Sequence, residues 1–200
     1  MKQLLPLKEG DNLINHYISI WTLIRSSGFL AYFFMTISLA IGLVSSFTVM
    51  KKKKAYLLSL HQISGWYGLL TIIFHLMLIW RDQYVPYSIP ELFVPLLANN
   101  QPIYSALGTL SFYLFFIVMI SSDFFIKKLG IKNWKKLHLA VFPAWVLMVL
   151  HGLLIGTDST ERWALVLYAG SISLIFVLSI LKYIETIMHG SEAKQGKLKN

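Results

Sequence analysis

The chain has 200 residues, of which 56% are hydrophobic and 14% are charged, and its formal net charge is +9. This apolar fraction is too high for a soluble domain, so the sequence predicts an integral membrane protein. The absence of cysteine excludes disulfides, thiolate metal sites, iron–sulfur clusters and covalent CxxCH haem attachment. Nucleic acid is not an expected partner, because the basic residues lie between the apolar blocks.

Five apolar blocks of 20 to 25 residues predict an all-α, polytopic bundle of five transmembrane helices, over 28–49, 56–80, 103–126, 137–156 and 163–184. Residues 21–184 are expected to form one membrane domain. Residues 1–20 show no cleavage site and are expected to be an external interfacial segment, and residues 185–200 a cytoplasmic basic tail.

Lysine and arginine divide unequally between the two sides of this arrangement. The side that holds the connections after the first and third blocks and the C-terminus has thirteen of them, and the other side has five. The positive-inside rule therefore predicts a multi-pass plasma membrane protein with the N-terminus outside and the C-terminus in the cytoplasm.

The first two blocks carry polar and small residues with two alternative roles each. Arg25, at the outer boundary, is expected either to anchor the helix by snorkelling or to pair with an anionic group of a cofactor. Gly28 and Gly42 allow close packing against a neighbouring helix. Gly65 and Gly68, in the second block, either leave space for a flat ring or bring helices together.

Two blocks carry a pair of histidines each, His61 and His75 in the second and His138 and His151 in the fourth. Imidazole in hydrocarbon requires a polar partner, and the apolar neighbours offer almost none. The members of the pairs are separated by about 21 Å and about 20 Å along a helix. If the two helices run parallel, His61 faces His138 and His75 faces His151. A metal between the helices would then occupy two stacked bis-imidazole sites.

The rotational spacing differs between the two blocks. Fourteen residues return to within about 40° of the starting face of an ideal helix, whereas thirteen leave the second pair about 140° apart. Pro143 lies between His138 and His151. Either this proline kinks or rewinds the helix, or the two sites are offset around the helix axis.

The remaining segments are expected to be supporting structure. The outer connection over 81–102 contains the apolar piece IPELFVPLLA, a candidate short amphipathic helix that either caps the outer site, meets a partner or fills space. The third block has no histidine and is expected to be scaffold, as is the fifth. Asp123 is expected to pair with Lys127, one helical turn later.

Two histidine pairs without thiolates or deep carboxylates argue against diiron, zinc hydrolase and proton-pump chemistry. Two non-covalent b-type haems, each with two imidazole ligands, fit best. Such an iron has no vacant position for a substrate, so the expected role is electron relay, and no catalytic residue is assigned. Arg25 outside, and Lys135 or Lys136 inside, are expected to meet the propionates.

The order of RSSGFLAY, HQISGWYGLLTIIFH and NWKKLH followed by a histidine thirteen residues later resembles the ferric reductase-like transmembrane domain. This domain is shared by ferric reductases, NADPH oxidases and the haem membrane subunit of the bacterial methionine-sulfoxide reductase system. The resemblance covers residues 21–184. It implies two b-type haems, with His61 and His138 as inner ligands, His75 and His151 as outer ligands, and Arg25 near the outer propionates. It also implies that electrons move outward.

Ferric reductases and NADPH oxidases continue into flavin and nicotinamide domains, whereas this sequence has no dinucleotide fingerprint. We therefore expect electrons from a cytoplasmic flavoprotein that carries FAD or FMN, or from a membrane quinol. The expected acceptor is ferric iron or an extracytoplasmic reductase partner. The alternative is a non-enzymatic transporter or assembly protein whose histidines bind a metal ion or form interhelical hydrogen bonds.

Overall fold

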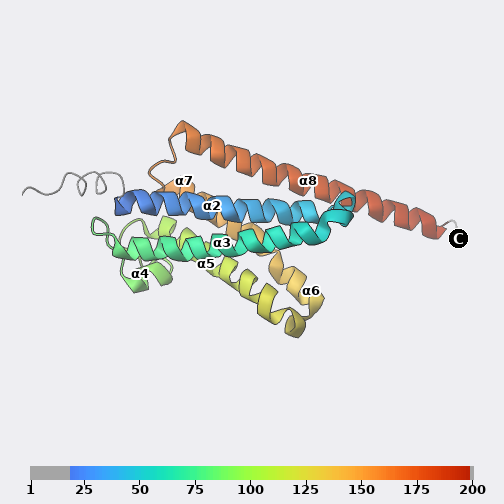
Figure 1. Cartoon of the computed structure of the whole chain (residues 1–200), viewed down its shortest axis with the longest axis horizontal. Helices are drawn as coiled ribbons and strands as arrows, with labels where there is room; N and C mark the ends of the chain where they lie inside the picture. Colours follow the sequence, from blue (N-terminus) through green and yellow to red (C-terminus); the bar gives the residue numbers. More distant parts are fainter. Residues whose placement is uncertain (1–18, 199–200) are drawn as a thin grey trace, which may run out of the picture.

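The computed structural model describes residues 19–198, which form helices and connections without a strand (Figure 1). The predicted all-α fold is confirmed for this part of the chain. Most of the predicted external segment, 1–18, and residues 199–200 lie outside the described residues. The elements are α2 (Ile20–Ser45), η1 (Thr48–Lys53), α3 (Lys54–Arg81), α4 (Ile89–Phe93), α5 (Pro102–Ile120), the π-helix η2 (Ser121–Phe125), α6 (Ile126–His138), α7 (Val141–Ile155) and α8 (Arg162–Leu198).

Four helical stretches within the described residues are long and apolar enough to cross a bilayer, Ile20–Ser45, Thr48–Arg81, Pro102–His138 and Arg162–His189. Only 17% to 39% of each apolar window is buried inside the molecule, as expected for helices with an apolar outer face. The protein is therefore a multi-pass membrane protein. The fourth predicted span is shorter than expected, because α7 has 15 residues, against the roughly 20 that a spanning helix needs.

The fourth apolar block is not one helix. His138 ends α6, and α7 starts three residues later, so the predicted span over 137–156 consists of two helical pieces. Pro143 accounts for the break because it has no N–H to donate to the Leu139 carbonyl. That carbonyl accepts from the Phe142 N–H at 3.1 Å in a tighter turn. The helix is thus interrupted between His138 and His151, in line with the alternative in which the proline kinks or rewinds it.

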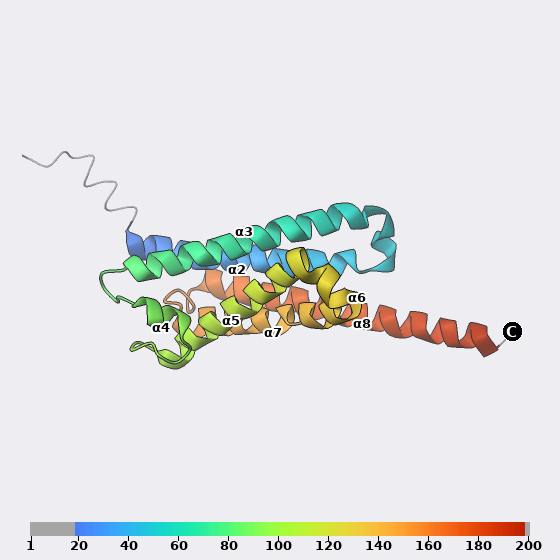
Figure 2. The same cartoon turned by 90° about the horizontal axis from the view of Figure 1, so that it is seen from below.

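Helix α2 is the central element of the bundle. It packs along α3 and also contacts α7 and α8, while α7 packs mainly on α5 (Figures 1 and 2). Helices α3 and α7 are not among the closely packed pairs. The hydrophobic core draws on α2, α3, α5, α7 and α8 and includes Met35, Leu69, Phe115 and Trp145. The Trp145 indole N–H donates to the Thr36 hydroxyl at 2.9 Å, which satisfies the one polar atom of this ring.

The small residues of α3 serve helix packing. A Cβ at Gly65 would lie 3.3 Å from the Met119 sulfur and 3.3 Å from the Ser38 hydroxyl. A Cβ at Gly68 would lie 3.0 Å from Met35. Of the two alternatives, these glycines bring α2 and α5 close to α3 and do not border space for a ring.

The two ends of the bundle differ in charge. The start of α2, the α3–α5 connection and the α7–α8 link lie at one end, and η1 and α6 lie at the other (Figures 1 and 2). The second end carries Lys51 to Lys54 and the five lysines at 127–136. Gly130, with φ +73°, permits the chain to reverse direction there. Basic residues thus gather at the end that the charge pattern assigned to the cytoplasm.

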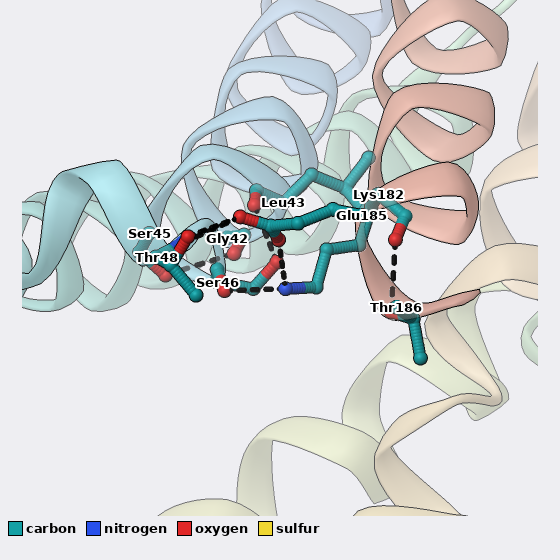
Figure 3. A network of polar contacts seen from close by, with 8 residues as sticks. All are labelled: Gly42, Leu43, Ser45, Ser46, Thr48, Lys182, Glu185 and Thr186. Carbon is teal, nitrogen blue, oxygen red and sulfur yellow. Dashed lines mark hydrogen bonds and ion pairs between the residues drawn. The ribbon is translucent and has the colours of Figure 1, made fainter. Parts of the chain in front are cut away.

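A polar network joins α8 to the turn between α2 and η1 at this basic end (Figure 3). The Glu185 carboxylate accepts from the Thr48 N–H at 2.8 Å and from the Lys182 ammonium at 2.7 Å. Lys182 also donates to the Ser46 carbonyl at 2.6 Å. The cation thereby satisfies a carbonyl at the C-terminal end of α2, where positive charge is favourable.

Candidate functional site

The structure brings His61 of α3 close to His138 at the end of α6. Their ring centroids lie 5.9 Å apart, and the ring planes make an angle of 73°. Two imidazoles that bind opposite sides of one metal at about 2 Å have centroids about 6 Å apart. The structure therefore brings the inner pair together, at a centroid distance close to this value.

The second pair, His75 of α3 and His151 of α7, lines one cavity of about 340 Å³ at the opposite end of the bundle. Arg25, Gly28 and Gly108 line the same cavity. Because α3 and α7 do not pack closely, the two histidines face space that is walled by α2 and α5. Asp82, Glu91 and Asp158 also line it. The outer cavity therefore combines two imidazoles and one arginine with three carboxylates in otherwise largely apolar surroundings.

Backbone carbonyls of neighbouring helices fix the proton positions on three of the imidazoles. The Nδ1 atoms lie 2.8 Å from a carbonyl for His61 with Ser38, 3.0 Å for His75 with Ile24, and 2.8 Å for His151 with Tyr104. A carbonyl oxygen only accepts, so each Nδ1 carries the proton that is donated. In the neutral ring, each Nε2 then keeps a free lone pair, which is the atom that a metal needs.

A glycine follows each of these three carbonyls by four residues, and the imidazole lies against it. A Cβ at Gly42 would be 3.1 Å from Cε1 of His61, and a Cβ at Gly28 would be 3.3 Å from Cε1 of His75. At Gly108 the distance to Cε1 of His151 would be only 2.7 Å. We call each pair of carbonyl and glycine a histidine seat. It combines a hydrogen-bond acceptor with the space in which the ring lies.

The two seats on α2 repeat every fourteen residues, like the two histidines on α3. Gly28 and Gly42 have the same separation as His61 and His75, so the neighbouring helices make the same contact twice. The third seat is on α5, which the sequence analysis assigned to scaffold only. Gly108 could have indicated this seat in the sequence, because it is a residue without a side chain within an apolar block.

Arg25 forms a two-point ion pair with Asp158 of the α7–α8 link. The Arg25 Nε and Nη2 atoms donate to the two carboxylate oxygens, each at 2.5 Å. The Asp158 side chain is 12% exposed and that of Arg25 is 40% exposed, and both residues line the outer cavity. Asp158 was not singled out from the sequence. The pair ties the start of α2 to the start of α8 beside the outer histidines.

Replacing Asp158 with asparagine is expected to lower the free energy of unfolding by about 1–2 kcal/mol, because the Arg25 guanidinium loses its charged partner. Thermal unfolding of the purified variant in detergent measures this change. Glu161→Gln is the matched control, since Glu161 is exposed and lies three residues further along the same connection. Equal melting temperatures for the two variants would contradict the structural role of the ion pair.

The expected pairing of Asp123 with Lys127 is wrong. The ion pairs among the described residues are Arg25–Asp158 and Lys182–Glu185. The Asp123 carboxylate accepts instead from the Trp66 indole N–H at 2.7 Å and from the Gln62 amide at 3.1 Å. The π-helix η2 thereby attaches to α3 beside His61.

The outer connection contributes to the wall of the outer cavity through residues that include Tyr87 and Glu91. Its short helix α4 begins at a capping box, in which Glu91 accepts from the Ser88 N–H at 2.8 Å. Glu91 also accepts from the Asn99 N–H at 3.0 Å. These bonds fold the connection upon itself. The Thr109 hydroxyl of α5 attaches it to the bundle by donating to the Leu92 carbonyl at 3.0 Å.

The same hydrogen bonds predict how this connection responds to acid. The Ser88 hydroxyl and N–H, together with Asn99, lower the pKa of Glu91 from 4.5 to about 2. A lowered pKa in the folded state stabilises the fold above pH 4.5, and this contribution is lost as the pH falls towards 2. Hydrogen-exchange protection of the Ser88 and Asn99 amides is therefore expected to be constant from pH 7 to pH 5. In Glu91→Gln it should already be reduced at pH 7.

No group of three or more histidine, aspartate or glutamate side chains in the described part of the chain is arranged to hold a metal ion. The two histidine pairs offer two ligands each. The family model described as "Ferric reductase like transmembrane component" matches residues 27–149. Searches of curated proteins and of solved structures found no match.

Proposed function

Because the chain belongs to the ferric reductase-like transmembrane family, whose model matches more than half of it, we propose that it is a membrane cytochrome b subunit. It relays electrons across the plasma membrane through two b-type haems. The inner haem is ligated by His61 and His138, and the outer haem by His75 and His151.

The observation that carries this proposal is the pair of imidazole couples at opposite ends of the bundle, with three Nδ1 protons held by carbonyls. A porphyrin supplies four ligands, so two histidines complete the coordination of its iron. Such a haem, when bound, supplies one-electron chemistry without an open position for substrate. Arg25 lines the outer cavity and would interact with a propionate of the outer haem in addition to Asp158.

The packed core between the two couples supports electron transfer as the task. Met35 lies midway between Gly28 and Gly42, and Leu69 and Trp145 lie near the midpoints of the histidine spacings on their own segments. These residues belong to one buried apolar cluster. Such a layer excludes water between the sites, which favours movement of electrons over movement of ions.

The membrane arrangement that we propose has five spans. Helix α7 reaches membrane-spanning length when the turn at 139–140 and the end of α6 are added to it, and these pieces lie in one apolar block. The lysine-rich end faces the cytoplasm, in accordance with the positive-inside rule. The outer cavity then opens towards the extracytoplasmic side.

We propose a cytoplasmic flavoprotein, carrying FAD or FMN, or a membrane quinol as the electron donor. The lysines of η1 and α6 would attract an acidic protein surface. The acceptor on the other side is ferric iron or an extracytoplasmic reductase. The outer end suits a small oxidant or a docked protein, because the cavity with His75 and His151 lies there.

A vesicle assay tests the proposal. The purified, haem-loaded protein is placed in liposomes that contain ferricyanide, and dithionite is added outside. Ferricyanide should be reduced much faster than in protein-free liposomes, and the double variant His75→Ala and His151→Ala should remove the acceleration. Equal rates with and without the wild-type protein would overturn the proposed relay.

A further inference from the structure

The fourth histidine of the two couples has a different seat from the other three. The residue fourteen positions after Gly108 is Ser122, in the π-helix η2, and its side chain occupies the place of a glycine. The Ser122 hydroxyl lies 3.2 Å from Nδ1 of His138. The carbonyl four residues earlier, of Val118, accepts from the serine hydroxyl at 2.7 Å.

The remaining contacts of this hydroxyl determine the direction of its bond to His138. A hydroxyl has one proton and two lone pairs, and the proton is donated to the Val118 carbonyl. One lone pair accepts from the indole N–H of Trp134 at 3.1 Å. The second lone pair is left for His138, so Nδ1 of His138 must be the donor. The Ser122 hydroxyl therefore bridges the imidazole and the Val118 carbonyl, whereas the other three imidazoles donate to a carbonyl directly.

The Trp134 ring strengthens this arrangement. It belongs to α6, one turn before His138, and the two ring centroids lie 5.2 Å apart. The indole thus contacts the imidazole face while its N–H orients the serine hydroxyl. Together they restrict the rotation of His138 at the point where α6 ends.

We propose that Ser122 is the positioning residue of His138 and holds its imidazole in the Nδ1–H form with Nε2 free for iron. The structure then gives all four histidines one tautomer. A backbone carbonyl accepts from His61, His75 and His151, the first two of which also have a serine hydroxyl within 3.1 Å of Nδ1, whereas at His138 a serine hydroxyl is itself the acceptor. The statement about iron rests on the proposed function, whereas the statement about the tautomer does not.

Ser121 provides a matched control for this proposal. Its hydroxyl also donates to the Val118 carbonyl, at 3.0 Å, and it is buried in the same π-helix. Only the Ser122 hydroxyl contacts His138 and Trp134. Ser121→Ala and Ser122→Ala therefore each remove one hydrogen bond to the Val118 carbonyl, but only Ser122→Ala also removes the contact with the imidazole.

The first readout uses the haem-free full chain. Nitrogen-15 NMR of the histidine rings, recorded at a pH at which they are neutral, should show His138 in the Nδ1–H form in the wild type and in Ser121→Ala. Ser122→Ala should shift this ring towards a mixture of tautomers, and Ser122→Thr, which keeps the hydroxyl, should restore the wild-type spectrum. A wild-type His138 with its proton on Nε2 would overturn the proposal even if no variant folded.

The second readout uses the haem-loaded protein. An acceptor for Nδ1–H makes the ligand more basic and stabilises oxidised iron, so its loss raises the midpoint potential. Ser122→Ala should raise the potential of one haem and leave the other unchanged, while Ser121→Ala should leave both unchanged. Identical potentials in both variants would contradict the positioning role. If the wild type bound no haem, the proposed function would fail, and the NMR result would still decide the role of Ser122.

Discussion

His61→Ala and His75→Ala are each expected to lose one haem and to keep the other, so that the haem content per chain falls by about half. Each substitution removes a ligand from only one couple, since His61 faces His138 and His75 faces the cavity with His151. The pyridine haemochrome absorbance of the purified variants, divided by protein concentration, measures the effect.

The exposed histidine of α8 supplies the control for this experiment. His189→Ala removes an imidazole outside both couples and should retain the full haem content. Loss of both haems from either single variant, with the protein still folded, would show that the two histidine pairs are not separate haem sites.

Gly108→Ala is expected to abolish binding of the outer haem while the inner haem remains. The added Cβ would lie 2.7 Å from Cε1 of His151 and 2.8 Å from its Nδ1, closer than atoms approach without displacement. The ring must then move away and lose its bond to the Tyr104 carbonyl. Optical redox titration should resolve one haem with one midpoint potential in this variant.

Two other glycines calibrate the effect of Gly108→Ala. Gly170→Ala on α8 meets nothing within 4 Å, so it should keep both haems and gain about 0.5–1 kcal/mol of helix stability. Gly28→Ala, with its closest contact at 3.3 Å, should weaken the outer haem less than Gly108→Ala does. The reverse order of haem loss would contradict the seat geometry.

The sequence was sufficient for the helical fold and the family. A bilayer leaves few choices for an apolar block, and a rise of about 1.5 Å per residue converts sequence spacing into depth. The family match over residues 27–149 confirms the resemblance. The ligand roles of the four histidines stay a prediction, although the structure brings His61 to His138 and places His75 and His151 at one cavity.

The sequence could not decide how the fourth block is interrupted, because Pro143 permits several local geometries. A proline in a helix removes one hydrogen bond, and the neighbouring residues decide whether the helix bends or breaks. Here the break falls before the proline, at the Leu139 carbonyl that lacks its usual donor. As a result α7 is only 15 residues long.

The partners of the charged residues were missed for a different reason. Asp158 lies 133 positions from Arg25, and Asp123 lies more than fifty positions from Gln62 and Trp66. Local spacing rules find neighbours one helical turn away, so they assigned Asp123 to Lys127. Contacts between distant segments depend on how the helices pack, which a single sequence does not disclose.

The central claim is that four imidazoles hold two haems. Its most direct test is the visible spectrum and pyridine haemochrome assay of the full chain, purified after expression with ample haem supply. We expect a red protein with the sharp reduced α-band of low-spin, bis-histidine iron and two b-type haems per chain. A folded, colourless protein would contradict it and would favour the transporter or assembly alternative.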